Sequence, residues 1–158
     1  MRTMLCLALL ILLGIVCRPA AAGSQGKGEE SLPMASLAEF VQLCGICHLE
    51  DGQGVPGAFP PLDERLNHWA GSADGRAYLV GVLVNGLFGP ITVAGQQYMG
   101  AMPGMANQLD SAQMAAMLNF ILVEHAQSGD ELLFSVTEVE QIRDRIGSSP
   151  SHPLRPAD

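Results

Sequence analysis

The stretch "LCGICHLEDGQG", from Leu43 to Gly54, brings two cysteines, a histidine and a glycine-rich tail close together in the chain. Four kinds of site use paired cysteines in this way: a disulfide, part of a zinc site, a thioredoxin-like redox pair and a covalent haem anchor. Each kind needs different partner residues and a different surrounding fold. The rest of the chain must therefore decide which chemistry this stretch carries.

The N-terminal residues predict an export signal. Arg2 precedes an apolar run from Met4 to Val16, and Ala20-Ala21-Ala22 then has the A-x-A form of a signal-peptidase site. We interpret residues 1–22 as a signal peptide that is cleaved, which places the protein in the periplasm. The alternative is an uncleaved membrane anchor, for which the apolar run is short.

Charge limits the class of partner. Removal of residues 1–22 leaves six Lys and Arg against 16 Asp and Glu, a formal net charge of −10. Such a chain is unsuited to nucleic acid, whose phosphates need basic partners, and to an anionic membrane surface. The charge favours a soluble monomer that meets protein partners with basic surfaces.

Two capping boxes predict where the main helices begin. Ser36-Leu37-Ala38-Glu39 fits the S-x-x-E pattern and starts a helix that runs into Cys44–His48. Asp110, followed by Gln113, starts a longer helix with apolar residues at helical spacing. Near the end of that helix, His125 is expected to be a cation that interacts favourably with the helix dipole.

The other segments complete a fold class that is all-α, with three to five helices and long loops. Residues 50–62 and 86–105 are rich in glycine and proline, so they are expected to be loops, the second with at most a short hairpin at Ile91–Val93. Further helices are predicted over residues 74–85 and from Thr137, where the pattern Thr137-x-x-Glu140 is a capping box. A flexible leader is expected at residues 23–35 and a disordered tail at residues 148–158.

Elimination favours one chemistry for the paired cysteines. Signal cleavage removes Cys6 and Cys17, and two thiols cannot supply the four ligands of a zinc site. A disulfide between them would close a ring too small to stabilise much, and no strand precedes them as in thioredoxin. The C-x-x-C-H pattern instead predicts one haem c, attached through Cys44 and Cys47, with His48 as an iron ligand.

A haem iron that carries electrons needs a second axial ligand, and a thioether raises its reduction potential. The loop at residues 86–105 offers Met99, Met102 and Met105. Met102 is the preferred candidate, because Pro103 would stiffen the chain that presents its sulfur. Met99 and Met105 remain alternatives by spacing alone. Met114 and Met117 lie on an apolar helix face and are expected in the core.

Other residues are candidates for supporting roles. The ring N–H of a haem histidine usually donates to a carbonyl, and the rigid segment after His48 offers those of Pro60 and Pro61. Trp69 and Tyr98 are expected either to line the haem or to be ordinary core aromatics.

With these residues in place, the chain resembles the class I cytochrome c family over residues 36–147. The shared pieces come in order: Phe40 ahead of Cys44-Gly-Ile-Cys47-His48, then "GVPGAFPPL", then "NGLFGPITVAGQQY" with Met-Pro, and a last long helix. The resemblance implies a compact helical fold around one haem. In that fold Cys44 and Cys47 are anchors, His48 is the proximal ligand, Met102 is the distal ligand, and Phe40 meets Phe120.

The resemblance also implies a function. The chain looks like small bacterial cytochromes that are free carriers or are attached to quinoprotein dehydrogenases and copper nitrite reductases. The expected function is a periplasmic one-electron carrier that works with redox protein partners and is not itself an enzyme. Two alternatives remain: a dedicated subunit of a dehydrogenase or nitrite-reducing complex, and a haem sensor or peroxidase with an open distal site.

Overall fold

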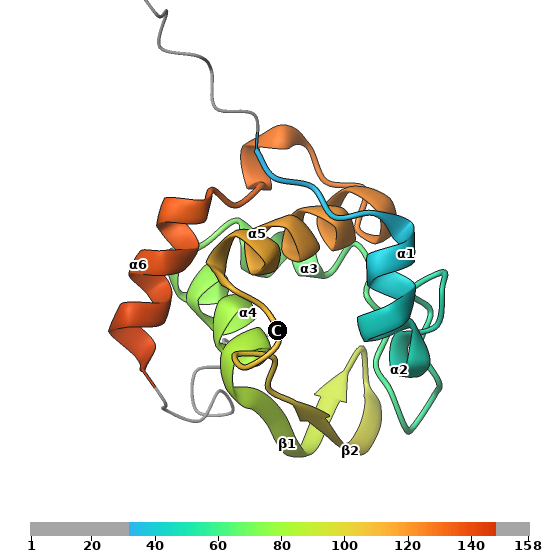
Figure 1. Ribbon diagram of the computed structural model, residues 1–158. Helices are drawn as coiled ribbons and strands as arrows, with labels where there is room; N and C mark the ends of the chain where they lie inside the picture. The colour runs from blue at the N-terminus through green and yellow to red at the C-terminus, as the bar shows by residue number, and fades with distance from the viewer. Residues whose placement is uncertain (1–31, 148–158) are drawn as a thin grey trace, which may run out of the picture. The chain divides into compact units, whose positions relative to one another are not determined.

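The computed structural model describes residues 32–147, which belong to one compact unit. The predicted signal peptide at 1–22, the tail at 148–158 and the leader up to residue 31 lie outside the described residues. Within residues 32–147, no helix is both long and apolar enough to cross a membrane. In Figure 1, α1 and α2 lie on one side, α4 and α6 on the other, and α5 and a β-hairpin lie between these two sides.

Three short helical pieces follow one another without a break at the N-terminal side: α1 (Leu37–Phe40), the π-helical turn η1 (Val41–Gly45) and α2 (Ile46–His48). The predicted capping box is confirmed. The Ser36 N–H donates to the Glu39 carboxylate at 2.7 Å, and the Glu39 N–H donates to Ser36 Oγ at 3.3 Å. This cap fixes the start of the helix that presents the two cysteines and His48.

Two further helices form the wall opposite α2. α4 (Ala73–Asn85) confirms the helix expected at 74–85, and Ser72 caps it by accepting a hydrogen bond from the Gly75 N–H at 3.1 Å. α3 (Leu66–Ala70) was not predicted from the sequence. No side chain caps its N-terminus, so the sequence contains no capping pattern that would predict where this helix starts.

The segment after α4 corrects the all-α expectation. β1 (Gly86–Val93) and β2 (Gln96–Pro103) pair as an antiparallel hairpin in which Gly86 lies opposite Pro103. The structure is therefore helical with one small two-stranded sheet. Only a short hairpin at Ile91–Val93 was expected, and the full length of the strands was missed because both faces of the hairpin are largely apolar: Leu87 and Met102 line a cavity, while Phe88 is exposed on the other face. No alternation of polar and apolar residues marks these strands.

The C-terminal part contains α5 (Ser111–Phe120), the π-helical turn η2 (Ile121–His125), the 3₁₀ turn η3 (Asp130–Leu132) and α6 (Val136–Ile146). The Asp110–Gln113 capping box is confirmed. The expected start of α6 at Thr137 is wrong, because Ser135 is the cap and accepts from the Glu138 N–H at 3.2 Å. The same side-chain chemistry acts two residues earlier.

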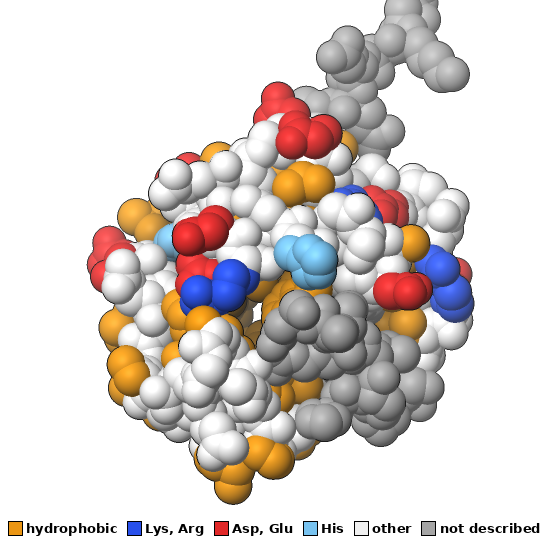
Figure 2. Space-filling view, turned by 180° about the vertical axis from the view of Figure 1, so that it is seen from behind, with side chains coloured by type: hydrophobic (Ala, Val, Ile, Leu, Met, Phe, Trp, Pro, Cys, Tyr) orange, Lys and Arg blue, Asp and Glu red, His pale blue; other side chains and the backbone are white. Residues whose placement is uncertain are grey.

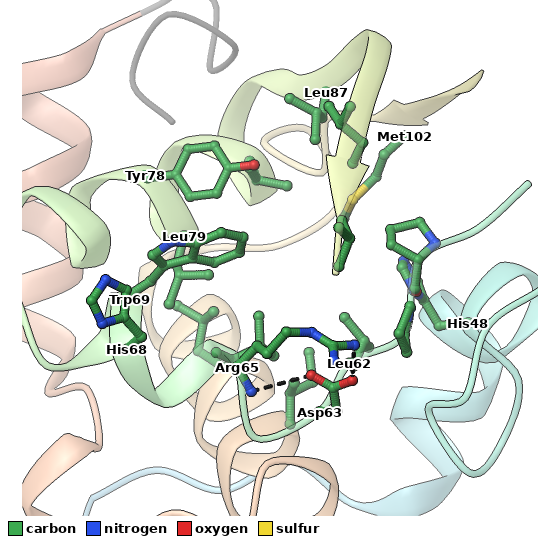
Figure 3. Close-up of a pocket in the computed structure, with 18 of the residues that line it drawn as sticks. His48, Leu62, Asp63, Arg65, His68, Trp69, Tyr78, Leu79, Leu87 and Met102 are labelled. Carbon is green, nitrogen blue, oxygen red and sulfur yellow. Dashed lines mark hydrogen bonds and ion pairs between the residues drawn. The ribbon is translucent and has the colours of Figure 1, made fainter. Parts of the chain in front are cut away.

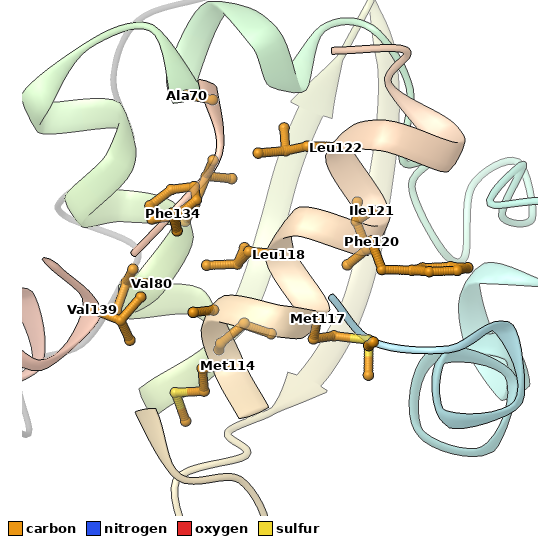
Figure 4. Close-up of a cluster of buried hydrophobic side chains, with 14 of the residues drawn as sticks. Ala70, Val80, Met114, Met117, Leu118, Phe120, Ile121, Leu122, Phe134 and Val139 are labelled. Atoms are coloured by element: carbon orange, nitrogen blue, oxygen red, sulfur yellow. The ribbon is translucent and has the colours of Figure 1, made fainter. Parts of the chain in front are cut away.

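The hydrophobic core lies around α5, as Figure 4 shows. Leu118 and Leu122 point toward Phe134, and Phe120 points the other way, toward α1. Phe40 and Phe120 stack with their ring centroids 5.3 Å apart, which confirms the contact that the resemblance implied. Met114 and Met117 are buried in this core, as the helical spacing predicted.

A buried asparagine links three parts of the chain. The Asn119 side-chain amide donates to the carbonyl oxygens of Pro33 at 2.8 Å and Phe134 at 3.0 Å, and its oxygen accepts from the Phe134 N–H at 2.7 Å. Ala35 also donates from its backbone to Ala116 at 3.0 Å. Residues 33 and 35, grouped with the leader in the sequence analysis, are thus bonded to α5.

Candidate functional site

An apolar cavity with a volume of about 430 Å³ lies between α2, α3, α4, the hairpin and α5. This volume is within the range of about 300–1,000 Å³ that is usual for small-molecule and cofactor sites. A second cavity of about 110 Å³ lies next to it. The two cavities share six lining residues: Cys44, His48, Pro60, Leu87, Ile91 and Met102. The predicted haem anchor, proximal ligand and distal ligand therefore surround one space.

The two cysteines are free thiols at the wall of this space. Cys44 is buried and lines both cavities, and Cys47 is partly exposed and lines the smaller one. Burial, with a smaller contribution from Cys47, raises the pKa of the Cys44 thiol to about 11. Cys44 is therefore a neutral thiol at neutral pH.

The histidine is held by one of the two carbonyls that the sequence predicted, that of Pro60. His48 Nδ1–H donates to the Pro60 carbonyl oxygen at 2.9 Å, which leaves the lone pair on Nε2 for a metal. Burial lowers the pKa of His48, while the hydrogen bond to Pro60 opposes this effect. The imidazole is therefore neutral at pH 7, as a metal ligand must be.

The three loop methionines have different surroundings. Met102 lines both cavities, and Figure 3 shows it entering the larger one from the hairpin, while His48 enters from α2. Met99 is 70% exposed on the opposite face of the hairpin. Met105 is 8% exposed, and the Gln108 amide donates to its sulfur at 3.5 Å. The geometry favours Met102, and its binding to iron stays a prediction.

The chain after Met102 is fixed to the end of α4. The Met105 N–H donates to the Leu83 carbonyl oxygen at 2.6 Å. A Cβ on Gly104 would lie 2.5 Å from the carbonyl oxygen of Val84, so only glycine fits at this close approach. These backbone contacts set the position from which Met102 reaches the cavity.

Gly104→Ala is therefore expected to displace the strand that carries Met102 and to destabilise the fold by about 1–3 kcal/mol. In the haem-loaded protein, the far-red charge-transfer band between the Met102 sulfur and the haem iron should weaken. Gly71→Ala is the control, because its Cβ would meet the Asn67 carbonyl oxygen at a milder 3.2 Å, at the end of α3 and not next to β2 in the chain. An unchanged band in Gly104→Ala would contradict this account of how Met102 is positioned.

Aromatic and charged residues form the remaining wall. Trp69 lines the larger cavity and packs edge-on against Tyr78 with centroids 5.0 Å apart, and Tyr98 lines the smaller cavity. Tyr78 was not predicted as a site residue, although it shares a helix face with the cavity-lining Val82. An ion pair between Asp63 and Arg65 lies at the mouth of the cavity (Figure 3).

His125 lies in the last turn of η2, near a helix end as expected, but the expectation that it is a cation there is wrong. Its ring packs against Phe40, with centroids 4.6 Å apart, and against Phe120 at 5.6 Å. Burial lowers the pKa of His125, and the nearby carboxylates of Glu124 and Asp51 only partly oppose this effect. The imidazole is therefore a neutral ring packed on aromatic side chains, and not a cation at a helix end.

The site defines a class of protein. Two thiols one helical turn apart, next to a neutral imidazole and an apolar cavity, fit a covalently attached porphyrin, so this is a haem protein of the c type. A family model described as Cytochrome c matches residues 38–123, more than half of the chain. The chain belongs to the cytochrome c family, and it is of the class I, single-haem type. Its cofactor is haem c, attached through Cys44 and Cys47.

Two groups of curated proteins are similar to this chain. A cytochrome c-552 of Thermus thermophilus is 43% identical over 94 residues, covering 60% of this chain and 63% of that protein. A second cytochrome c-552 of Thermus thermophilus is 44% identical over 87 residues and is covered to 66%. The cytochrome c subunit of a quinone alcohol dehydrogenase from Gluconobacter oxydans is 35% identical over 91 residues, 17% of its length. The chain spans less than two thirds of the length of each.

Proposed function

We propose that this protein is a periplasmic one-electron carrier whose haem iron is bound by His48 and Met102. The observation that supports this most strongly is that His48 and Met102 line the same two adjoining cavities. Bound haem would supply the one-electron chemistry, and His48 and Met102 would hold its iron at the two positions that oxygen chemistry would otherwise need.

The protein residues keep the two oxidation states similar in geometry. The Pro60 carbonyl holds the orientation of the His48 ring, and two thioether bonds at Cys44 and Cys47 would fix the porphyrin. The hairpin lines the cavity with the apolar side chains of Leu87 and Ile91. Little therefore needs to move when the charge on the iron changes, which favours fast electron transfer.

An exposed apolar region around Cys47 is the proposed electron port. Ile46 is 79% exposed and Phe88 59%, and Val55 and Met99 are also exposed. The stretch from Ala77 to Leu109, which contains the hairpin, has no charged residue. In the view of Figure 2, the acidic side chains lie on the upper part of the face and hydrophobic ones at its lower end. A partner with an apolar contact surface and basic residues around it would fit this pattern.

Electron transfer to a basic redox partner is therefore expected to slow as salt increases. Raising the ionic strength from about 10 mM to 500 mM should reduce the bimolecular rate constant by at least about tenfold, because screening weakens steering by the acidic chain. Stopped-flow kinetics with a basic and an acidic redox protein would measure it. A rate that does not depend on salt with the basic partner would contradict electrostatic steering.

The function has a direct test. The full chain, produced in a periplasm with cytochrome maturation, should give an intact mass equal to the mature polypeptide plus one haem. Its pyridine haemochrome should be typical of two saturated vinyl groups. The oxidised protein should also show a far-red sulfur-to-iron charge-transfer band. Fast binding of carbon monoxide to the reduced protein would instead favour a sensor or peroxidase with an open distal site.

A second candidate is a dedicated electron-transfer subunit of a periplasmic dehydrogenase. The similarity to the cytochrome c subunit of the Gluconobacter oxydans quinone alcohol dehydrogenase favours it. The haem chemistry would be the same in both cases. A subunit would stay bound to one enzyme, whereas a free carrier would bind its partners transiently. Gentle purification from the source periplasm separates the two, because a subunit elutes with its enzyme and a free carrier elutes at its monomeric mass.

A further inference from the structure

His125 is a partly buried residue whose Nε2 atom is buried, and it has no role in the function proposed above. Its ring lies at the end of η2 and packs against both Phe40 and Phe120, which also stack on each other. Among the described residues, its Nε2 is the buried side-chain nitrogen or oxygen that lacks a hydrogen-bond partner. An unpartnered buried nitrogen is unfavourable for stability. A phenylalanine in the same place would avoid this cost, so the packing of the core does not by itself explain a histidine here.

The His125 ring also lies against the loop that follows His48. A Cβ on Gly52 would be 2.7 Å from Cγ of His125 and 3.0 Å from Nδ1, so the imidazole rests directly on this glycine. Gly52 has a φ of +70°, which favours glycine as well. The backbone at Gly52 therefore cannot move toward η2 without displacing the imidazole.

Gly52 in turn supports the carbonyl that orients His48. The Leu62 N–H donates to the Gly52 carbonyl oxygen at 2.8 Å. Leu62 comes directly after Pro60-Pro61, and the Pro60 carbonyl oxygen accepts from His48 Nδ1 at 2.9 Å. A continuous set of contacts thus runs from His125 through Gly52 and Leu62 to the hydrogen bond of the proximal histidine.

The far side of η2 is fixed as well. The Ala126 N–H donates to the Ile121 carbonyl oxygen at 3.0 Å, which closes the π-helical turn. The Asn67 amide donates to the Ala126 carbonyl oxygen at 2.9 Å, and Ser128 Oγ donates to the Asn67 side-chain oxygen. π-helical turns often occur at functional sites. Here the turn is held from α3 and presents the His125 ring to the loop.

We propose that His125 is a positioning residue for the proximal haem ligand: its ring holds the loop at Gly52 and so keeps the Pro60 carbonyl on Nδ1 of His48. The proposal rests on the proposed function only in requiring His48 to bind the haem iron. A shorter, better-held Nδ1–H···O bond makes His48 a stronger donor to iron, which favours the ferric state. Loss of the ring should therefore raise the reduction potential.

The test uses the haem-loaded full chain and three variants. His125→Ala should raise the reduction potential and speed the exchange of the His48 Nδ1 proton by about tenfold, as seen by NMR of the reduced protein. His125→Phe keeps a ring on Gly52, so it should retain the wild-type potential and exchange rate. Leu122→Ala, a truncation of a buried side chain in the same turn, should lower stability to urea and leave both quantities unchanged.

Each outcome decides the question. If His125→Ala loses stability but keeps the potential and the exchange rate, His125 is only a core residue and the proposal fails. If Leu122→Ala changes both quantities as much as His125→Ala, general destabilisation is the cause and the proposal also fails. The ligation of the wild type is checked first by its charge-transfer band. A missing band would refute Met102 as the ligand, while the His48 exchange measurement would still test His125.

Discussion

Met102→Ala is expected to abolish the far-red sulfur-to-iron charge-transfer band of the oxidised protein and to lower the reduction potential. The thioether stabilises ferrous iron, so its loss favours the ferric state. The expected fall is on the order of 0.1–0.3 V, a fraction of the ~0.8 V range that axial ligands span. The vacated position should also bind carbon monoxide in the reduced protein. Absorption spectroscopy and a redox titration measure all three effects.

Met99→Ala is the matched control, because Met99 lies in the same strand but is 70% exposed on its outer face. It should keep the band and the potential. Met105→Ala tests the remaining alternative. Met105 lines the smaller cavity and has its sulfur bonded to Gln108, so its truncation should lower stability and leave the band in place. Loss of the band in Met105→Ala but not in Met102→Ala would overturn the ligand assignment.

Arg76→Met is expected to destabilise the fold by about 3 kcal/mol, the low end for breaking a buried ion pair. Arg76, on α4, binds the Glu138 carboxylate on α6 through two hydrogen bonds of 2.5 and 2.6 Å. It also donates to the carbonyl oxygens of Ala70, Leu132 and Leu133 at 2.8–3.0 Å. A methionine would leave these acceptors without a donor. The low end applies because the Glu138 side chain is 33% exposed and can rehydrate.

Urea unfolding followed by circular dichroism measures this loss, and two variants define its cause. Arg76→Lys keeps the charge but loses the planar fork and its stacking on Phe134, 3.8 Å from the ring centroid, so it should cost about 1–2 kcal/mol. Arg143→Met removes a single bond, to Ser111, and should cost no more than about 1 kcal/mol. Equal losses in Arg76→Met and Arg143→Met would contradict the special role of Arg76.

The sequence predicted those parts of the fold that have local signals. Ser36 and Asp110 start helices through capping boxes, and both patterns lie within four residues. α3 has no side-chain cap, so no local pattern predicts it. α6 is capped by Ser135, although Thr137 has a similar capping pattern in the sequence. The hairpin has apolar residues on both faces, because one face covers the cavity and the other is an exposed apolar surface. Its strands therefore lack the alternation of polar and apolar residues that identifies a strand in a sequence.

The residues of the site likewise divide into those that a local sequence pattern predicts and those that only the folded structure identifies. Cys44, Cys47 and His48 form a contiguous motif, and the Pro60 carbonyl follows from a rigid segment a short distance downstream. The choice among Met99, Met102 and Met105 needed the strand pairing, which sets the face on which each side chain lies. His125 could not be understood from its neighbours in the sequence. Its surroundings come from Phe40 and Gly52, which are more than 70 residues away in the chain.

The two π-helical turns have a consequence for how residues are counted along the chain. A π-helical turn holds about one residue more than an α-helical turn, and one residue corresponds to a rotation of about 100° around a helix. η1 lies directly between Phe40 and Ile46, so the extra residue sets the angle at which Cys47 and His48 leave the helix relative to Phe40. The direction in which Cys47 and His48 project from the helix thus depends on the number of residues in this turn as much as on their identity.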